Sequence, residues 1–212
     1  MKTEDLINAL IADLTVSKMR FRWIFGGAIA LGAVIAAVLF HLLIGVRPDI
    51  GQAAESARFL FKFIVTIGLA ITAAGLLSRL AIPGVPSGPW RWAWLSVPVL
   101  LAVAVLAELV AAPASAWWPR LLGSNAKYCL SLIPFLSIGP LACILLALRQ
   151  GAPTEPGRAG AVAGLVSGGI AAALYASHCT DDSPLFVATW YSLAIGVVVL
   201  AGYIAGSRLL RW

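Results

Sequence analysis

The sequence predicts an all-α integral membrane protein with six transmembrane helices and a cytoplasmic N-terminal amphipathic helix. Hydrophobic residues make up 61% of the 212 residues and charged residues only 11%, whereas a soluble domain carries about 25% charged residues. The apolar residues also gather into six runs, each of about 20 residues and long enough to cross a hydrocarbon core of ~30 Å. The lipid bilayer is therefore the first partner that the sequence implies.

Three regions follow from this pattern. Residues 1–22 form a cytoplasmic amphipathic tail, residues 23–206 form the six-helix bundle, and residues 207–212 form a short cytoplasmic C-terminal tail. The runs lack the alternation of barrel strands and are too long for them. We place the six spans at Trp23–Ile44, Arg58–Leu77, Trp92–Ala112, Ala126–Leu148, Ala159–Ser177 and Phe186–Gly206.

The distribution of basic residues predicts the orientation. With the N-terminus inside, ten of the 15 lysines and arginines fall on the inner side and five on the outer side, as the positive-inside rule requires. Six spans then place both termini in the cytoplasm, which indicates a multi-pass membrane protein. The five outer cations are Arg47, Arg58, Lys62, Arg120 and Lys127. Basic residues spread this thinly do not form the patch that direct nucleic-acid binding needs.

Residues Thr3–Ser17 have the pattern of an amphipathic helix. Thr3 can cap it, and Glu4 and Asp5 in the first turn suit the helix dipole. Three interpretations stay open on the residues alone: a helix lying on the membrane, a helix docked on its own bundle, or a helix offered to the groove of a cytoplasmic partner. One face of it is apolar and consists of Leu6, Ile7, Leu10, Ile11 and Leu14.

The polar stretch Ala176–Phe186 separates the last two spans and lies on the outer side. It contains His178, Cys179, Asp181 and Asp182 and has no lysine or arginine. Cys129 lies near the outer start of the fourth span, and Cys143 follows it by 14 residues, which is about 21 Å along a helix. The topology therefore pairs Cys129 with Cys179 and sets Cys143 apart.

Two interpretations of the cysteine pair remain open. One is structural, either a disulfide in an oxidising compartment or two small residues packed in the bundle. The other is redox or metal sensing, because thiolate and imidazole bind soft metal ions. We expect no resident cofactor, and at most a transient soft metal ion held by His178, Cys179, Cys129 and Asp181.

Other polar and small residues in the spans carry weaker signals. His41, Lys62 and Glu108 lie near span ends, where we expect them to reach the interface as anchors. The fifth span carries consecutive GxxxG matches from Gly160 to Gly168, which favour packing within the bundle over dimerisation. No hydrolase, metalloprotease or nucleotide-binding motif is present, so we do not expect an enzyme. The alternative function is a small metal or ion transporter or efflux component.

The chain resembles the NrsF-like anti-sigma factors, which are negative regulators of an extracytoplasmic-function sigma factor. The resemblance covers the whole chain and rests on the opening Met1–Leu10, the six-span layout, Cys129, and the stretch Cys179–Phe186 followed by Thr189-Trp190-Tyr191.

This resemblance implies a membrane-held inhibitor whose N-terminal segment binds the sigma factor and keeps it from RNA polymerase. The apolar face of the N-terminal helix would then be the sigma-factor-binding surface. The resemblance further implies that Cys129 and Cys179 sense oxidant or heavy-metal stress and cause release, whereas Cys143 lies outside the pattern.

Overall fold

A bundle of long helices forms the whole architecture. The computed structural model describes residues 3–86 and 88–210, with side chains from residue 20 onward. Within these residues every regular element is helical, and six helical stretches are long and apolar enough to span a membrane. This confirms the predicted fold class. The six stretches are Arg20–Leu43, Ala57–Leu80, Trp90–Ala111, Ala126–Leu148, Pro156–Ala176 and Pro184–Leu209.

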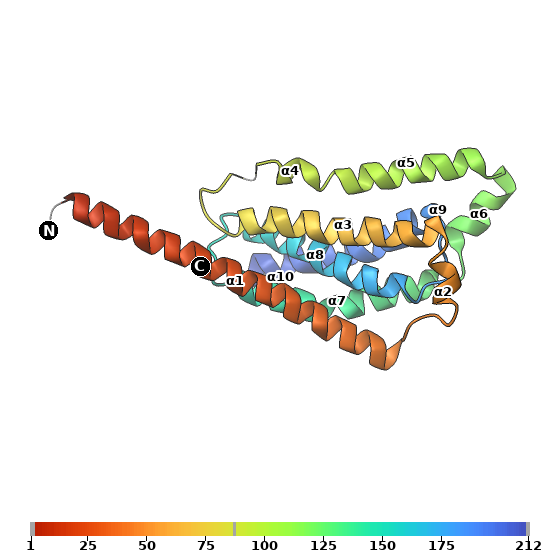
Figure 1. Cartoon of the computed structure of the whole chain (residues 1–212), viewed down its shortest axis with the longest axis horizontal. Coiled ribbons are helices and arrows are strands. Elements are labelled where there is room, and N and C mark those ends of the chain that lie inside the picture. Colours follow the sequence, from red (N-terminus) through yellow and green to blue (C-terminus); the bar gives the residue numbers. More distant parts are fainter. Residues whose placement is uncertain (1–2, 87, 211–212) are drawn as a thin grey trace.

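The elements run in the order α1 (Thr3–Leu43), α2 (Ile50–Ala53), α3 (Ala57–Leu80), α4 (Trp90–Ala93), α5 (Ser96–Ala111), α6 (Ala114–Leu122), α7 (Ala126–Leu148), α8 (Pro156–Ala176), α9 (Pro184–Phe186), a π-helical turn (Val187–Tyr191) and α10 (Ser192–Leu209). The connections divide between two ends of the bundle (Figure 1). We call the end formed by residues 44–56, 112–125 and 177–183 the cysteine face. The opposite end, formed by residues 81–86, 88–89 and 149–155 together with the end of α10, is the terminal face.

The predicted amphipathic helix and the first span form one continuous helix, α1. Neither glycine nor proline interrupts the sequence between Thr3 and Phe25, so nothing in the backbone breaks the helix there. Beyond Leu43 the chain turns at Gly45, whose positive φ of 74° lets its N–H bond back to the Phe40 carbonyl at 2.8 Å. Figure 1 shows the N-terminal part of α1 extending well beyond the terminal face.

The third span differs from the prediction because it is divided into α4 and α5. Pro98 has no N–H to donate to the residue four positions before it, so it sits in the first turn of α5, where none is needed. A further helix, α6, lies between the predicted third and fourth spans, where no element was predicted. Trp117 and Trp118 of α6 are exposed at the cysteine face, where aromatic rings suit the membrane interface.

Helix α8 lies in the middle of the bundle and packs closely on α10. A Cβ added to Gly160 would lie 2.8 Å from the Gly206 Cα, and one added to Gly164 would lie 2.7 Å from the Val198 carbonyl oxygen. These glycines therefore allow the two backbones to approach each other, as small residues do in membrane helices. This confirms the expectation that the glycine-rich span packs within the bundle.

The close approach of α8 and α10 can be tested with two alanine variants of α10. A Cβ on Gly202 would overlap the Gly160 carbonyl oxygen, whereas nothing lies within 4 Å of a Cβ on Gly196. Gly202→Ala should lower the free energy of unfolding by about 1–3 kcal/mol because the backbones must separate. Gly196→Ala should leave it unchanged or slightly raised. Thermal or denaturant unfolding in detergent measures both, and equal stability of the two variants would contradict this packing.

Candidate functional site

The stretch between α8 and α9, residues 177–183, forms a short loop that we call the cysteine loop. It begins where the N–H groups of His178 and Cys179 both bond to the Tyr175 carbonyl, at 2.9 and 3.0 Å. It ends at Ser183, whose hydroxyl accepts from the Leu185 N–H at 3.2 Å and caps α9, with Pro184 in the first helical position. The loop is therefore anchored at both ends.

Cys129 of α7 and Cys179 of this loop lie in one buried cluster. Both side chains are 0% exposed, and the same cluster contains Tyr175 of α8 and Tyr191 of the π-helical turn. The two tyrosine rings lie 6.0 Å apart between centroids, and neither hydroxyl has a hydrogen-bond partner among the described residues. Cys143 is partly exposed and lies outside this cluster, and all three thiols are free.

The sequence placed the two cysteines on the outer side of the membrane and left open whether they pack within the bundle; in the structure both are enclosed. Burial raises the pKa of the Cys179 thiol above its ordinary value, while the nearby Lys62 charge acts in the opposite direction. A raised pKa leaves less of the thiolate, which is the reactive form. In the closed arrangement Cys179 is therefore protected both from contact with reagents and by its protonation state.

Asp181 fastens the cysteine loop to the start of α7. Its carboxylate accepts from the backbone N–H groups of Ser124 at 3.0 Å and Asn125 at 2.8 Å, and from the Asn125 side-chain amide at 3.0 Å. A carboxylate at this position satisfies N–H groups that a helix start leaves free and suits the helix dipole. Gly123 provides the room, since a Cβ there would lie 2.7 Å from the Asp181 Cγ.

We expected Lys62 of α3 to reach the membrane interface as an anchor. Its side chain instead contacts the cysteine loop inside the bundle. Its side chain is 0% exposed. Its Nζ donates to the Cys179 carbonyl at 2.8 Å and lies 2.5 Å from an Asp182 carboxylate oxygen. A buried charge is tolerated only when it is paired in this way, and removing one partner of such a pair costs roughly 3–5 kcal/mol.

Arg47, from the connection after α1, binds the same two groups. Its guanidinium donates to Asp182 Oδ2 at 3.2 Å and to the Cys179 carbonyl at 3.4 Å, and it also pairs with Asp49 at 2.6 Å. Its backbone N–H donates to the Ser177 carbonyl at 3.1 Å. The hydrogen bond with Asp49 raises the pKa of Arg47 and lowers that of Asp49, so this pair stays ionised near neutral pH.

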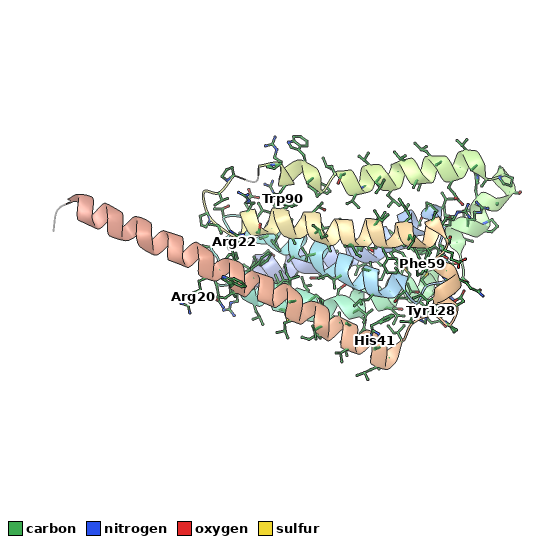
Figure 2. The ribbon with its side chains drawn as sticks, viewed as in Figure 1. Arg20, Arg22, His41, Phe59, Trp90 and Tyr128 are labelled. Atoms are coloured by element: carbon green, nitrogen blue, oxygen red, sulfur yellow. The ribbon has the colours of Figure 1, made fainter. Side chains whose placement is uncertain are left out.

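Arg47, Lys62 and Asp182 thus form a charged clamp on the cysteine loop. The ring of Phe59 lies under both cations, with its centroid 5.8 Å from the Arg47 Cζ and 5.2 Å from the Lys62 Nζ. Figure 2 shows Phe59 near the cysteine face, at the same end of the bundle as His41 and Tyr128. The sequence analysis placed Arg47 and Lys62 on this side but did not pair them with the acidic loop. The signal was present, because the loop has two carboxylates and no cation of its own.

The four candidate metal ligands do not form a ready metal site. The His178 Nδ1 donates to the Gly45 carbonyl at 3.0 Å, and the Asp181 carboxylate is occupied by the start of α7. Within the part of the chain that the structure describes, no three His, Cys, Asp or Glu side chains gather in a way that could hold a metal ion. Coordination by all four residues would require the loop to rearrange.

The remaining ionisable residues have different surroundings. Glu108 of α5 is 5% exposed and is paired with Arg58, at 2.9 Å, and with Arg120 of α6. It therefore joins α3, α5 and α6 and does not act as a free interfacial anchor. His41 is exposed and its Nδ1 bonds to the Ala37 carbonyl of the preceding turn at 2.9 Å, as expected of a residue at the interface.

The predicted partner-binding face lies in the N-terminal part of α1. Its backbone is helical from Thr3 onward, which agrees with the helix predicted there. The structure describes side chains only from residue 20 onward, so the five apolar side chains of this face lie outside the described part. They are Leu6, Ile7, Leu10, Ile11 and Leu14.

Comparison with known proteins connects these features to a family. Residues 10–212 match the family described as "Negative regulator of sigma F". The chain is 37% identical over 221 aligned positions to the anti-sigma-F factor NrsF of Caulobacter vibrioides, and 34% identical over 214 positions to a probable anti-sigma-F factor NrsF of Azospira oryzae. Both matches cover 100% of each chain. No solved structure matches the chain. With this similarity along its full length, the chain belongs to the NrsF family of negative regulators of sigma F.

Proposed function

We propose that this protein is a membrane-bound anti-sigma factor that sequesters an extracytoplasmic-function sigma factor through its N-terminal helix. The observation that carries this proposal is the similarity to two proteins named as anti-sigma-F factors, over the whole of both chains. The proposed regulator is not an enzyme and needs no resident cofactor. It acts by holding a partner at the membrane.

The shape of α1 supports the N-terminal segment as the partner-binding part. The helix leaves the bundle at about Arg20, and its first part extends beyond the other helices (Figures 1 and 2). A helix held away from its own bundle can lay an apolar face into the groove of another protein. This favours partner binding over docking on the bundle.

The orientation follows from the charge count. We propose that the terminal face lies in the cytoplasm of a bacterial inner membrane, where more of the basic residues lie. The sigma factor would then meet the N-terminal helix directly. The cysteine face would lie in the periplasm, which is oxidising.

We propose that Cys129 and Cys179 sense the stress that triggers release. Their location in one buried cluster supports this, because it places both thiols in the same part of the bundle. The two thiols would give up two electrons and two protons to an oxidant, such as a peroxide that becomes water. A soft metal ion bound by the two thiolates would be a second stimulus.

Burial of the thiols gives the sensor a threshold. The reagent reaches Cys179 only when the cysteine loop opens, and opening breaks the contacts of Asp181 and Asp182 described above. Reversing a 1:99 equilibrium of bound and released partner takes about 5.5 kcal/mol. A covalent bridge or thiolate ligation can supply this, whereas exposed ion pairs contribute only about 0–1 kcal/mol.

The surroundings of the ionisable residues do not favour the alternative, an ion transporter. Among the described buried side chains the charged ones are Arg47, Lys62 and Glu108. Each is engaged in an ion pair toward the cysteine face: Arg47 and Lys62 with Asp182, and Glu108 with Arg58. A proton- or ion-coupled pathway needs ionisable groups deeper in the membrane.

The N-terminal helix can be tested by deletion. Removing residues 2–17 should raise transcription from a promoter of the cognate sigma factor to the level seen without the protein, because the partner is no longer held. Leu10→Asp should have most of this effect, and Asn8→Asp, on another face of the same helix, should have little. A reporter fusion measures the activity, and immunoblotting of membranes confirms equal protein levels. Unchanged activity after the deletion would rule out this role of the tail.

Serine substitutions test the sensing role. Cys129→Ser and Cys179→Ser should each abolish most of the induction by diamide or cadmium, since neither variant can form the bridge or the two-thiolate site. Cys143→Ser is the matched control on α7 and should respond like the unaltered protein. The same reporter, read before and after treatment, measures the response. Normal induction in the Cys129→Ser/Cys179→Ser double variant would show that the stimulus acts elsewhere.

A further inference from the structure

The cysteine loop is joined to the end of α1 at several atoms. The Arg47 guanidinium bonds to the Cys179 carbonyl and to Asp182, the Arg47 backbone N–H bonds to the Ser177 carbonyl, and the His178 ring bonds to the Gly45 carbonyl. Gly45 and Arg47 follow the last residue of α1, Leu43, by two and four positions. These contacts lie within a short stretch of chain, so a movement of the loop acts directly on the end of this helix.

Helix α1 is the one element that runs without interruption from this contact to the N-terminal tail. It has 41 residues, which corresponds to a length of roughly 60 Å. Because the helix is continuous, a tilt imposed at one end is carried along its backbone. A small tilt imposed at the cysteine face therefore displaces the other end, at and beyond Arg20, by a larger distance.

Bridging the two thiols moves the atoms that Arg47 holds. Both thiols are free and buried, and a disulfide requires the two sulfurs to approach to about 2.05 Å. Cys129 is fixed in α7, so the backbone of Cys179 makes most of the movement. Its carbonyl, which accepts from both Arg47 and Lys62, moves with it.

We propose that Arg47 is the positioning residue that transmits the state of the cysteine pair to α1, and through α1 to the N-terminal tail. This deepens the proposed function and rests on it for the consequence of the movement, which is release of the partner. Lys62 holds the same carbonyl but belongs to α3, whose far end at Leu80 continues into the connection to α4. Lys62 therefore keeps the cysteine loop closed, whereas Arg47 transmits movement of the loop to α1.

The Arg47 side chain suits this role better than a lysine would. A guanidinium has a planar fork of donors that can bind a carboxylate and a carbonyl together, whereas an ammonium is a point charge. The same group is also held by Asp49, two residues further along the chain. The three contacts together fix its direction, so that the loop and the connection after α1 move as one body.

The test measures the position of α1 in the full-length protein in lipid nanodiscs. Spin labels carried on bio-orthogonal amino acids replace Arg20 of α1 and Arg91 of α4, which are both exposed near the terminal face. Diamide oxidises the thiols, taking two electrons and two protons and becoming the hydrazine, and mass spectrometry follows the bridge. Cys179→Leu, which displaces the loop by its bulk, is a second perturbation that needs no chemistry.

In the otherwise unaltered protein, either perturbation should shift the distance between the labels by about 3 Å, as a tilt of ~5° does over the roughly 35 Å from residue 20 to residue 43. Arg47→Met should abolish the shift while the bridge still forms. Arg47→Lys keeps the charge beside Asp182, protects folding and should reduce the shift by at least half. Arg58→Met is the matched control, because Arg58 lies on the same face but pairs with Glu108, and it should shift like the parent.

Two results would overturn the proposal: no shift in the parent protein under either perturbation, or a full shift in both Arg47 variants. Neither result depends on a sigma factor. Retention of the cognate sigma factor by the same nanodiscs is measured separately. Loss of that retention in all samples would count against the proposed function alone, and a shift that depends on Arg47 would still support transmission through α1.

Discussion

The charged clamp of Asp182 with Lys62 and Arg47 is the interaction on which the cysteine face depends. It brings a loop between α8 and α9 into contact with α3 and with the connection after α1, residues that lie 120 and 135 positions away along the chain. Without it a buried lysine would have no counter-ion and the carbonyl of Cys179 would lose both of its donors. The cysteine loop therefore closes over the thiols because Asp182 forms ion pairs with both Arg47 and Lys62.

The rest of the bundle provides the rigid frame that this clamp needs. The glycines of α8 let it pack directly on α10, and both helices enter the cluster that contains Cys129, Cys179 and the two tyrosines. Asp181 fixes the loop to the start of α7, which carries Cys129. Because α7, α8 and α10 are packed closely together, bridging of the two thiols would move these helices little. The movement would fall instead on the elements that the clamp joins, α3 and the connection after α1.

Much of the fold could be predicted because hydropathy reports the spans directly, and the bounds of the fourth span agree with those of α7, Ala126–Leu148. The continuity of α1, the division of the third span at residues 94–95 and the helix α6 were missed, because they depend on local backbone chemistry within or beside apolar runs. The sequence also placed Cys129 and Cys179 on one side. It could not predict their burial or the clamp, because contacts between Arg47, Lys62 and Asp182 join distant parts of the chain and leave no local pattern.

The central claim is that the fold places Cys129 and Cys179 where they bridge with each other once an oxidant reaches them. Mapping of disulfide-linked peptides from oxidised membranes tests it most directly, because it reads the pairing itself without a partner or a reporter. The account predicts an intramolecular Cys129–Cys179 bridge as the main product, with Cys143 still free. A bridge from Cys143, or a link between two chains through Cys179, formed in preference to that pair would contradict it.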